Sequence, residues 1–272
     1  GNGISLDNLR PVNTPTQNSS RTSTGIISWM RRYSNSIREV GQHGRRGALM
    51  LSLNVHHPQI LDFITAKKNR KDVTGANVSV ALTDEFLRSV KENGEYQQRW
   101  PIDSKTPEIS KSVDANSVWQ TIIANAHDNA EPGILFWDNI IKESPADCYA
   151  DDGFKTVGTN PCSELPLSAL DSCRLLFLPL LTYVDNAFSS KSSFNYKKFF
   201  EDVKIAQRMM DNIIDLELEC VQRIIDKIDS DPESETIKSR ERDIWVRIYE
   251  NCKNGRRTGL GITALGDAIA AL

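Results

Sequence analysis

The chain has few cysteines and no long apolar run. Its five cysteines are widely spaced and form no Cys-x-x-Cys pair, which indicates neither a disulfide scaffold nor a zinc site of that kind. The longest apolar run, residues 175–181, contains Pro179 and is far too short to span a bilayer, and no secretory signal opens the chain. We therefore expect a protein of the reducing cytoplasm that has no membrane partner.

A basic excess is also missing. The net charge of −3 argues against nucleic acid as a partner, although a local basic stretch can still hold phosphates. With 272 residues, 39% of them hydrophobic, the chain is long enough to bury a real core.

The two ends do not look like natural termini. Residues 1–25 are rich in Asn, Ser, Thr and Gly, which predicts a loop. Residues 256–272 predict an amphipathic helix without a cap or polar tail. We expect the chain to be a segment of a longer protein.

Between these ends, strand-like and helix-like stretches alternate. Thr83 is expected to cap a helix, and residues 93–112 look like a polar excursion. The alternation predicts parallel strands covered by helices, that is, the α/β class, with a C-terminal third that is mainly helical. The expected elements are a helix at 26–40, a strand at 48–55, a helix at 57–68, a strand at 76–82, helices at 83–93 and 112–129, a strand or short helix at 132–140, two helices over 194–229 and one over 231–252.

The stretch "NPCSE", residues 160–164, places an amide, a thiol and a carboxylate at every second position. In an extended segment, Asn160, Cys162 and Glu164 would share one face, and Pro161 favours extended geometry in the residue before it. Two interpretations compete. The segment is either a polar turn with a small buried Cys, or a catalytic group with a base, a hydrogen-bond donor and a reactive thiol.

The longer stretch "NPCSELPLS…DSCRL" resembles the catalytic segment of the ribonucleotide reductase large subunit. The surroundings resemble the same family, in order along nearly the whole chain: "RRGALMLSLNVHHPQILDFI", "DVTGANVSVALTDEF" and "RRTGLGITALGDAIAAL". The resemblance implies radical-based reduction of ribonucleotides to 2′-deoxyribonucleotides for DNA synthesis. It also implies part of a ten-stranded α/β barrel, with the catalytic Cys on an inner finger loop.

The resemblance implies a role for each matched position. Cys162 would carry the thiyl radical that removes the ribose 3′-hydrogen. Glu164 would take the 3′-hydroxyl proton, and Asn160 would hydrogen-bond the ribose hydroxyls. Cys173 would be one of two thiols that reduce the 2′-carbon, although it could equally be a core cysteine. The family's second redox cysteine has no match in this chain, which we expect to be inactive when isolated.

Two cationic loops, residues 41–48 and 66–77, are either solvated or hold phosphate at helix–strand junctions. The resemblance matches them to the loops that bind an effector dNTP or ATP. A weaker match assigns Thr24 and Gly25 to the substrate pocket. The candidate effector-binding residues are Arg45, Arg46, Lys68, Asn69, Arg70 and Lys71.

Two motifs are set aside. Adjacent His56 and His57 on a strand point to opposite faces, so we interpret them as packing and turn residues and expect no metal site. The "GLGITALG" stretch, residues 259–266, resembles a dinucleotide-binding loop, but no strand is expected before it.

Within the family, the sequence looks most like the adenosylcobalamin-dependent branch. Three alternatives stay open: a large subunit that uses a separate radical-generating subunit, a glycyl-radical enzyme, and a nucleotide-binding module that needs complementing pieces. The implied partners are a ribonucleotide, a dNTP effector, thioredoxin or glutaredoxin as reductant, and the remaining segments of the enzyme; a homodimer is also open. We expect one partial catalytic domain, with a first half-barrel at 1–150, the finger loop and redox-cysteine strand at 151–175, and a helical segment that begins the second half at 176–272.

Overall fold

The computed structural model describes residues 1–41, 44–69 and 71–272. The chain forms two compact units, Gly1–Ala169 and Leu170–Leu272, each of which is described by itself.

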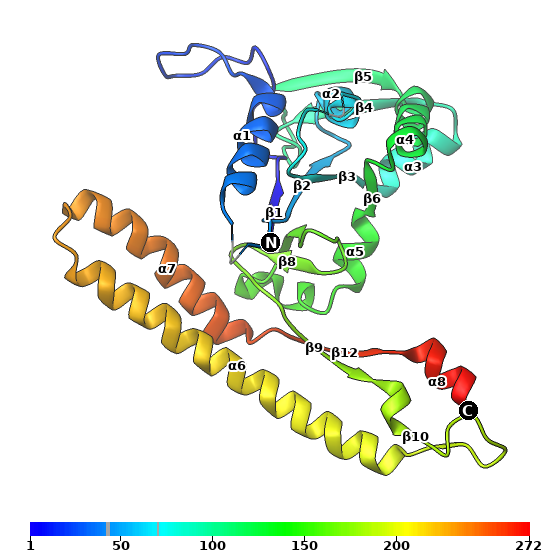
Figure 1. Ribbon diagram of the computed structural model, residues 1–272. Coiled ribbons are helices and arrows are strands. Elements are labelled where there is room, and N and C mark those ends of the chain that lie inside the picture. The colour runs from blue at the N-terminus through cyan, green and yellow to red at the C-terminus, as the bar shows by residue number, and fades with distance from the viewer. Residues whose placement is uncertain (42–43, 70) are drawn as a thin grey trace. The chain divides into compact units, whose positions relative to one another are not determined.

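A parallel four-stranded sheet forms the centre of the first unit (Figure 1). The strand order is β1-β2-β3-β6, so each strand lies beside the one that precedes it in this sheet. Every residue of β2 is buried, as expected for a parallel strand covered on both faces. The strands are β1 (Asn2–Ser5), β2 (Leu49–Asn54), β3 (Asn77–Leu82) and β6 (Gly133–Phe136).

Helices connect and follow these strands, which confirms the predicted alternation. Thr83 caps α3 as predicted, because its hydroxyl oxygen accepts a hydrogen bond from the Phe86 N–H at 3.3 Å. Asp114 caps α4 in the same way through the Ser117 N–H, at 2.9 Å. The helices are α1 (Gly25–Glu39), α2 (Ile60–Thr65), α3 (Asp84–Lys91), α4 (Ala115–Asn129) and α5 (Trp137–Glu143).

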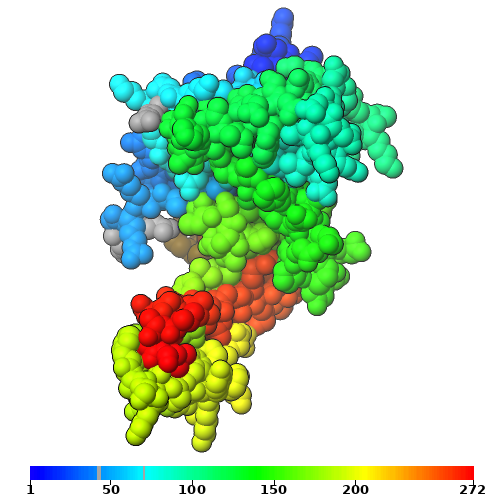
Figure 2. Space-filling view, turned by 90° about the vertical axis from the view of Figure 1, so that its right-hand side faces the viewer, coloured from blue at the N-terminus to red at the C-terminus, as the bar shows by residue number. Residues whose placement is uncertain are grey.

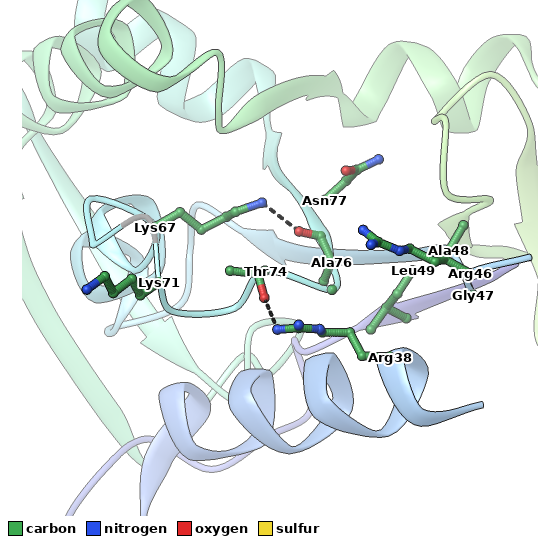
Figure 3. A pocket seen from close by; sticks show the side chains of 11 residues that line it. Arg38, Arg46, Gly47, Ala48, Leu49, Lys67, Lys71, Thr74, Ala76 and Asn77 are labelled. Atoms are coloured by element: carbon green, nitrogen blue, oxygen red, sulfur yellow. Dashed lines mark hydrogen bonds between the residues drawn. The ribbon is translucent and has the colours of Figure 1, made fainter. Parts of the chain in front are cut away.

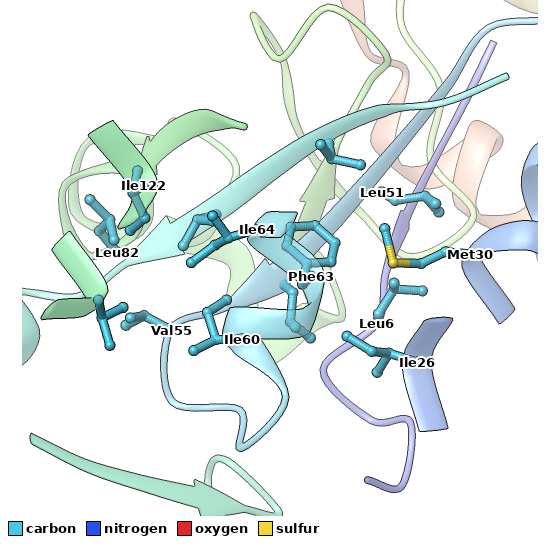
Figure 4. Packing of buried hydrophobic residues seen from close by; sticks show 14 of the residues in the cluster. Leu6, Ile26, Met30, Leu51, Val55, Ile60, Phe63, Ile64, Leu82 and Ile122 are labelled. Atoms are coloured by element: carbon cyan, nitrogen blue, oxygen red, sulfur yellow. The ribbon is translucent and has the colours of Figure 1, made fainter. Parts of the chain in front are cut away.

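The core of the first unit lies between the sheet and these helices (Figure 4). Leu51 and Val80 from the sheet, Met30 from α1 and Phe63 from α2 are all fully buried. Burial of a side chain of this size stabilises a fold by about 1.5–3 kcal/mol. This packing holds the sheet in place as the base on which the later segments of the unit rest.

Two segments predicted as irregular are strands instead. Residues 93–112 were expected to be a polar excursion, but β4 (Glu95–Trp100) and β5 (Ile109–Asp114) pair there as an antiparallel hairpin. In β4, Tyr96 and Gln98 alternate inward and are 1% exposed, which is a period-two pattern hidden by polar residues.

The opening of the chain is also ordered. Residues 2–5 were expected to be loop, but they form β1, whose residues pair in parallel with β2 from Asn2 opposite Leu49 onward. Pairing with a buried strand overrides the turn preference of Asn and Gly. The loop between β1 and α1, in dark blue, protrudes from this unit (Figure 2).

The first unit ends in a small hairpin. A 3₁₀-helix, η1 (Asp147–Asp152), leads to β7 (Thr156–Thr159), which pairs antiparallel with β8 (Pro166–Ser168). The segment between these two strands contains the "NPCSE" motif.

The second unit is mainly helical, as predicted, around a two-stranded parallel sheet of β9 and β12. Arg256 follows α7 and binds two carboxylates of α6, Asp211 at 2.6 Å and Asp215 at 2.9 Å. The elements are β9 (Arg174–Pro179), η2 (Leu180–Tyr183), β10 (Val184–Asp185), β11 (Ser193–Phe194), α6 (Tyr196–Ser230), α7 (Glu235–Gly255), β12 (Thr258–Thr263) and α8 (Leu265–Ala271).

Two predictions for this unit are wrong. The residues 194–229 were expected to form two helices, but α6 is one helix of 35 residues, because no Gly or Pro interrupts it. The final residues were expected to form one helix, but 258–263 form a strand. Gly259 allows this pairing, since a β-carbon there would lie 2.5 Å from the Leu175 side chain of β9.

The α/β class is therefore confirmed. Within residues 1–41, 44–69 and 71–272, the parallel strands occur as one sheet of four and one sheet of two. Closure of a ten-stranded barrel, and the assignment of the whole chain to one catalytic domain, stay predictions.

Candidate functional site

The "NPCSE" motif forms a tight turn at the tip of the β7–β8 hairpin. The Ser163 N–H donates to the Asn160 carbonyl oxygen at 3.1 Å, and the Asn160 N–H donates to the Leu165 carbonyl oxygen at 3.2 Å. The predicted extended geometry of this segment is wrong. Pro161 occupies the second position of the turn, which its fixed φ favours, and Ser163 has a left-handed φ of 70°.

The turn presents the thiol and the carboxylate rather than burying them. The side chains of Cys162 and Glu164 are both exposed. The Asn160 side chain works within the turn, because its Oδ1 accepts the Leu165 N–H at 3.0 Å. The Asn160 Nδ2 is then the atom with which this side chain would donate to a ligand. The turn thus brings the three predicted catalytic residues together without aligning them on one strand face.

The hairpin packs closely against the sheet. Gly3 of β1 lies against the Thr159 carbonyl, where no β-carbon fits. Pro161 is buried beside Gly1, and its carbonyl oxygen accepts a hydrogen bond from the Asn77 Nδ2 at 3.0 Å. These contacts fix the position of the turn that carries Cys162. Sequence reasoning missed Asn77, whose only signal was its position at the start of a strand after a glycine-containing loop.

A cavity of about 550 Å³ adjoins this turn. Its lining includes the apolar side chains of Ile134, Phe136 and Ile140, together with Ser163 and Pro166 of the turn region. A ligand with an apolar face could therefore pack beside the Cys162 turn.

A second cavity, of about 820 Å³, is cationic (Figure 3). We call it the cationic pocket. It lies at the starts of β2 and β3, near the C-terminal end of α1. Among the residues that the structure describes, its basic lining side chains are Arg38, Arg46, Lys67 and Lys71. Guanidinium and ammonium groups converging on one cavity are suited to phosphate.

Two of these cations already hold the loop before β3. The Arg38 Nη1 donates to the Thr74 hydroxyl oxygen at 2.6 Å. The Lys67 Nζ donates to the Ala76 carbonyl oxygen at 2.7 Å and also pairs with Glu131. The segment that precedes Asn77 is therefore tied to the side chains that would bind an anion.

The predicted effector residues fall into three groups. Arg46 and Lys71 line the cationic pocket. Arg45, Lys68 and Asn69 lie outside its lining, and Arg70 lies outside the described residues. Sequence reasoning missed Arg38 and Lys67; the signal for both was a basic residue beside a glycine-flanked or cationic loop.

The predicted substrate residues begin α1. The Thr24 hydroxyl lies 2.7 Å from that of Ser28. Gly25 has a φ of 72°, and a β-carbon there would lie 2.5 Å from Gln59 Oε1, which accepts the Ile26 N–H at 3.2 Å. The structure thus gives Gly25 a packing reason, and its contact with substrate stays a prediction.

Cys173 belongs to the second unit and directly precedes β9. It is partly buried, and a β-carbon built at Gly259 of β12 would lie 3.2 Å from its sulfur. The next residue, Arg174, binds Glu217 and donates to the Cys252 sulfur at 3.0 Å. The redox role of Cys173 stays a prediction.

The two adjacent histidines are packing residues, as predicted. His57 is fully buried, and its Nε2 lies 3.0 Å from the Leu9 carbonyl oxygen. His56 contacts the Tyr96 hydroxyl through Nδ1 and the Arg99 guanidinium through Nε2. Burial, followed by the nearby Arg99 charge, lowers the pKa of His56 to about 4.

Across residues 1–41, 44–69 and 71–272, no group of three or more His, Cys, Asp or Glu side chains is placed to hold a metal ion. Over the same ranges, the helices are too short or too polar to cross a bilayer.

Comparison with known proteins places the chain in a family. Residues 1–272 match the family described as "Ribonucleotide reductase, barrel domain". The chain is 28% identical over 274 residues to a vitamin B12-dependent ribonucleoside-diphosphate reductase of Mycobacterium tuberculosis, and this alignment covers 100% of this chain and 34% of the relative. It is 32% identical over 217 residues to a Thermoplasma acidophilum protein of the same name, and this alignment covers 79% of this chain and 27% of the relative. The chain is 24% identical over 305 residues to the ribonucleoside-diphosphate reductase large chain of Schizosaccharomyces pombe, and this alignment covers 100% of this chain and 33% of the relative.

The chain belongs to the ribonucleotide reductase barrel-domain family, which confirms the resemblance seen in its motifs. It spans about a third of the length of the curated relatives that it matches from end to end.

Proposed function

We propose that this chain is the part of a ribonucleotide reductase that carries the radical thiol. The observation that carries the proposal is the exposed Cys162 on a sheet-anchored turn, with Glu164 and Asn160 beside it, in a barrel-domain chain. The names of the relatives favour ribonucleoside diphosphates as substrates.

The residues divide the reaction between them. The Cys162 sulfur, as a thiyl radical, takes the 3′-hydrogen of the ribose and becomes a thiol. Glu164 accepts the 3′-hydroxyl proton, while Asn160 Nδ2 donates to a ribose hydroxyl. The 2′-hydroxyl takes a proton from one of the two redox thiols and leaves as water. Cys173 and the second thiol supply two electrons, the other thiol hydrogen goes to C2′, and the two sulfurs end as a disulfide. Glu164 returns its proton to the 3′-oxygen, and Cys162 returns the hydrogen to C3′ and is a thiyl radical again.

Adenosylcobalamin is the cofactor we propose, because several relatives are named as vitamin B12-dependent. The apolar cavity beside the turn of the exposed Cys162 would receive one apolar face of this cofactor. Phe136, Ile140 and Pro166 would provide apolar contacts for it. When bound, it supplies the radical chemistry that oxidises the thiol.

The cationic pocket would bind the phosphates of an effector, a dNTP or ATP, through Arg46 and Lys71 together with Arg38 and Lys67. Thioredoxin or glutaredoxin would reduce the disulfide between turnovers. We place the enzyme in the cytoplasm, with the remaining segments of the reductase as partners and a homodimer as one form of assembly.

The test is a Cys162→Ser variant, assayed with all segments of the reductase present. We expect deoxyribonucleotide formation to be lost while dNTP binding survives. Cys220→Ser, which changes an exposed cysteine of α6 in the second unit, is the control and should keep full turnover. Normal turnover by Cys162→Ser would contradict the radical assignment. Nucleotide binding without turnover in the complete wild-type assembly would favour the binding module.

A further inference from the structure

A single guanidinium anchors the segment that carries Cys173. Arg174 begins β9, and its side chain is 10% exposed. Its Nε and Nη2 pair with the two carboxylate oxygens of Glu217 on α6, at 2.7 Å and 2.6 Å. The Nη2 also donates to the Cys252 sulfur of α7 at 3.0 Å. Arg174 thus ties the start of β9 to both long helices of the second unit.

The third nitrogen of this guanidinium holds the backbone around Cys173. The Arg174 Nη1 donates to the Ser172 carbonyl oxygen at 3.2 Å and to the Arg257 carbonyl oxygen at 3.3 Å. Ser172 is the residue just before Cys173, and Arg257 directly precedes β12, the strand that pairs with β9. Each of the five N–H groups of Arg174 therefore has a partner, and two of these partners are backbone oxygens next to the thiol segment.

Cys173 and Arg174 leave the chain in opposite directions. Successive residues of an extended segment alternate between faces, so Cys173 and Leu175 share the face opposite to Arg174. A β-carbon built at Gly259 of β12 would lie 2.5 Å from the Leu175 side chain and 3.2 Å from the Cys173 sulfur, which agrees with this placement. Leu175 is exposed. The thiol is therefore presented on the exposed face of the two-stranded sheet, while Arg174 holds the covered face.

Packing alone does not explain an arginine at this position. Burial of a guanidinium costs free energy unless its charge is paired. Leu176 and Leu178, which follow on the same face of β9, are partly buried without that cost. The arginine therefore serves the contacts that it makes, and these contacts fix the residue before the thiol and the residue after it.

We propose that Arg174 is the positioning residue of the redox thiol Cys173. A disulfide forms only when the β-carbons of two cysteines come within about 3.5–4.5 Å, so a redox thiol must be held where its partner sulfur can reach it. Arg174 provides this by fixing the backbone at residues 172 and 257 against α6 and α7. The inference rests on the proposed function in that Cys173 gives its hydrogen and one electron to the ribose and ends in a disulfide.

The test is an Arg174→Lys variant in the complete reductase. Lysine keeps the charge, but its single nitrogen cannot hold Glu217, Cys252 and two carbonyl oxygens at once. We expect kcat to fall by about 100-fold, the effect of misplacing a reacting group by about 1 Å, while KM stays unchanged. Urea denaturation of the variant checks that it is folded under the assay conditions.

A ribonucleotide tritiated at C3′ separates positioning from a general structural defect. In Arg174→Lys, Cys162 still takes the 3′-hydrogen, but the slow reduction leaves this hydrogen on the thiol, where it exchanges with water. The tritium released per deoxyribonucleotide formed should therefore rise above the wild-type ratio. A general loss of structure would lower tritium release and product formation together and leave their ratio unchanged.

Arg242→Lys is the matched control. Arg242 of α7 also binds a carboxylate of α6 through its Nε, Asp229 at 2.8 Å, but it is exposed. This variant should keep the wild-type kcat and tritium ratio. An Arg174→Lys variant with wild-type kcat, or with a lowered kcat and an unchanged tritium ratio, overturns the positioning role alone. Full turnover by Cys173→Ser overturns the redox role of Cys173 as well. Absence of both product and tritium release in the complete wild-type assembly overturns the proposed function itself.

Discussion

Gly3 of β1 lies against the carbonyl oxygen of Thr159 in β7, so closely that a β-carbon at position 3 would stand 1.6 Å from that oxygen. The hairpin that carries Cys162 can therefore rest on the sheet only where the sheet has no side chain. This contact joins the first strand of the unit to its last hairpin.

Gly3→Ala should destabilise the first unit by about 3 kcal/mol, the upper end of the range for overpacking, because a backbone atom must move. The measurement is chemical denaturation followed by circular dichroism. Gly158→Ala is the control: a β-carbon there meets nothing within 4 Å, so its stability should stay within about 0.5 kcal/mol of wild type. Equal stability of the two variants would show that the hairpin does not pack on β1.

The buried His56 should make stability depend on pH. Burial and the Arg99 charge lower its pKa from 6.5 to about 4, so the folded state binds this proton more weakly than the unfolded state. The contribution of His56 is present above pH 6.5 and is lost as the pH falls toward about 4. Asp7 acts oppositely, because burial raises its pKa from 3.8 to about 6, and its contribution is lost as the pH rises through that window.

Comparison with His56→Gln isolates the histidine, since Asp7 titrates in both proteins. Between pH 7 and pH 4, the wild-type chain should lose on the order of 2–3 kcal/mol more stability than the variant. Urea denaturation at a series of pH values measures this difference. Parallel profiles for the two proteins would mean that His56 is not desolvated in the folded state.

Arg46→Ala and Lys71→Ala should each weaken dTTP binding by about tenfold, which corresponds to about 1.4 kcal/mol. Each change removes a cation that lines the pocket. Isothermal calorimetry at two salt concentrations should also show a shallower salt dependence in the variants, since fewer charges are neutralised. Lys111→Ala removes an exposed cation of β5 outside the pocket lining and should bind as wild type does. A similar loss in Lys111→Ala would indicate only a general effect of net charge.

Glu164→Gln keeps the size of the side chain but removes the proposed base. In the complete reductase we expect kcat to fall by about 100-fold with little change in KM, because proton transfer of this kind contributes to the chemical step. Glu241→Gln changes an exposed carboxylate of α7 and should leave both constants as they are. An unchanged kcat in Glu164→Gln would remove Glu164 from the mechanism.

Local sequence signals were sufficient to predict an element where a few neighbouring residues decide its structure. The Thr83 cap and the apolar run of β2 are examples, because hydroxyl capping and two-sided burial act over a few neighbouring residues. The residue types at 160–164 were also sufficient to predict reactive side chains there, although not the geometry of the turn.

Tertiary pairing explains what the sequence did not reveal. β4 and β5 are polar enough to look like loop, yet their partner is each other. The residues of β12 predict a helix, but the glycines among them allow the segment to pair closely with β9. In the site, Asn77 and Pro161 are 84 residues apart, so no local pattern could have joined them.

Arg256 binds both Asp211 and Asp215, and these two ion pairs fix the position of α7 along α6. The two acids stand four residues, about one helical turn, apart on α6, and a slip of α7 by about 6 Å along its neighbour would exchange one carboxylate for the other. Because Arg256 binds both carboxylates at once, any axial slide of α7 would break one of the two ion pairs. The two ion pairs therefore set the register of α7 along α6.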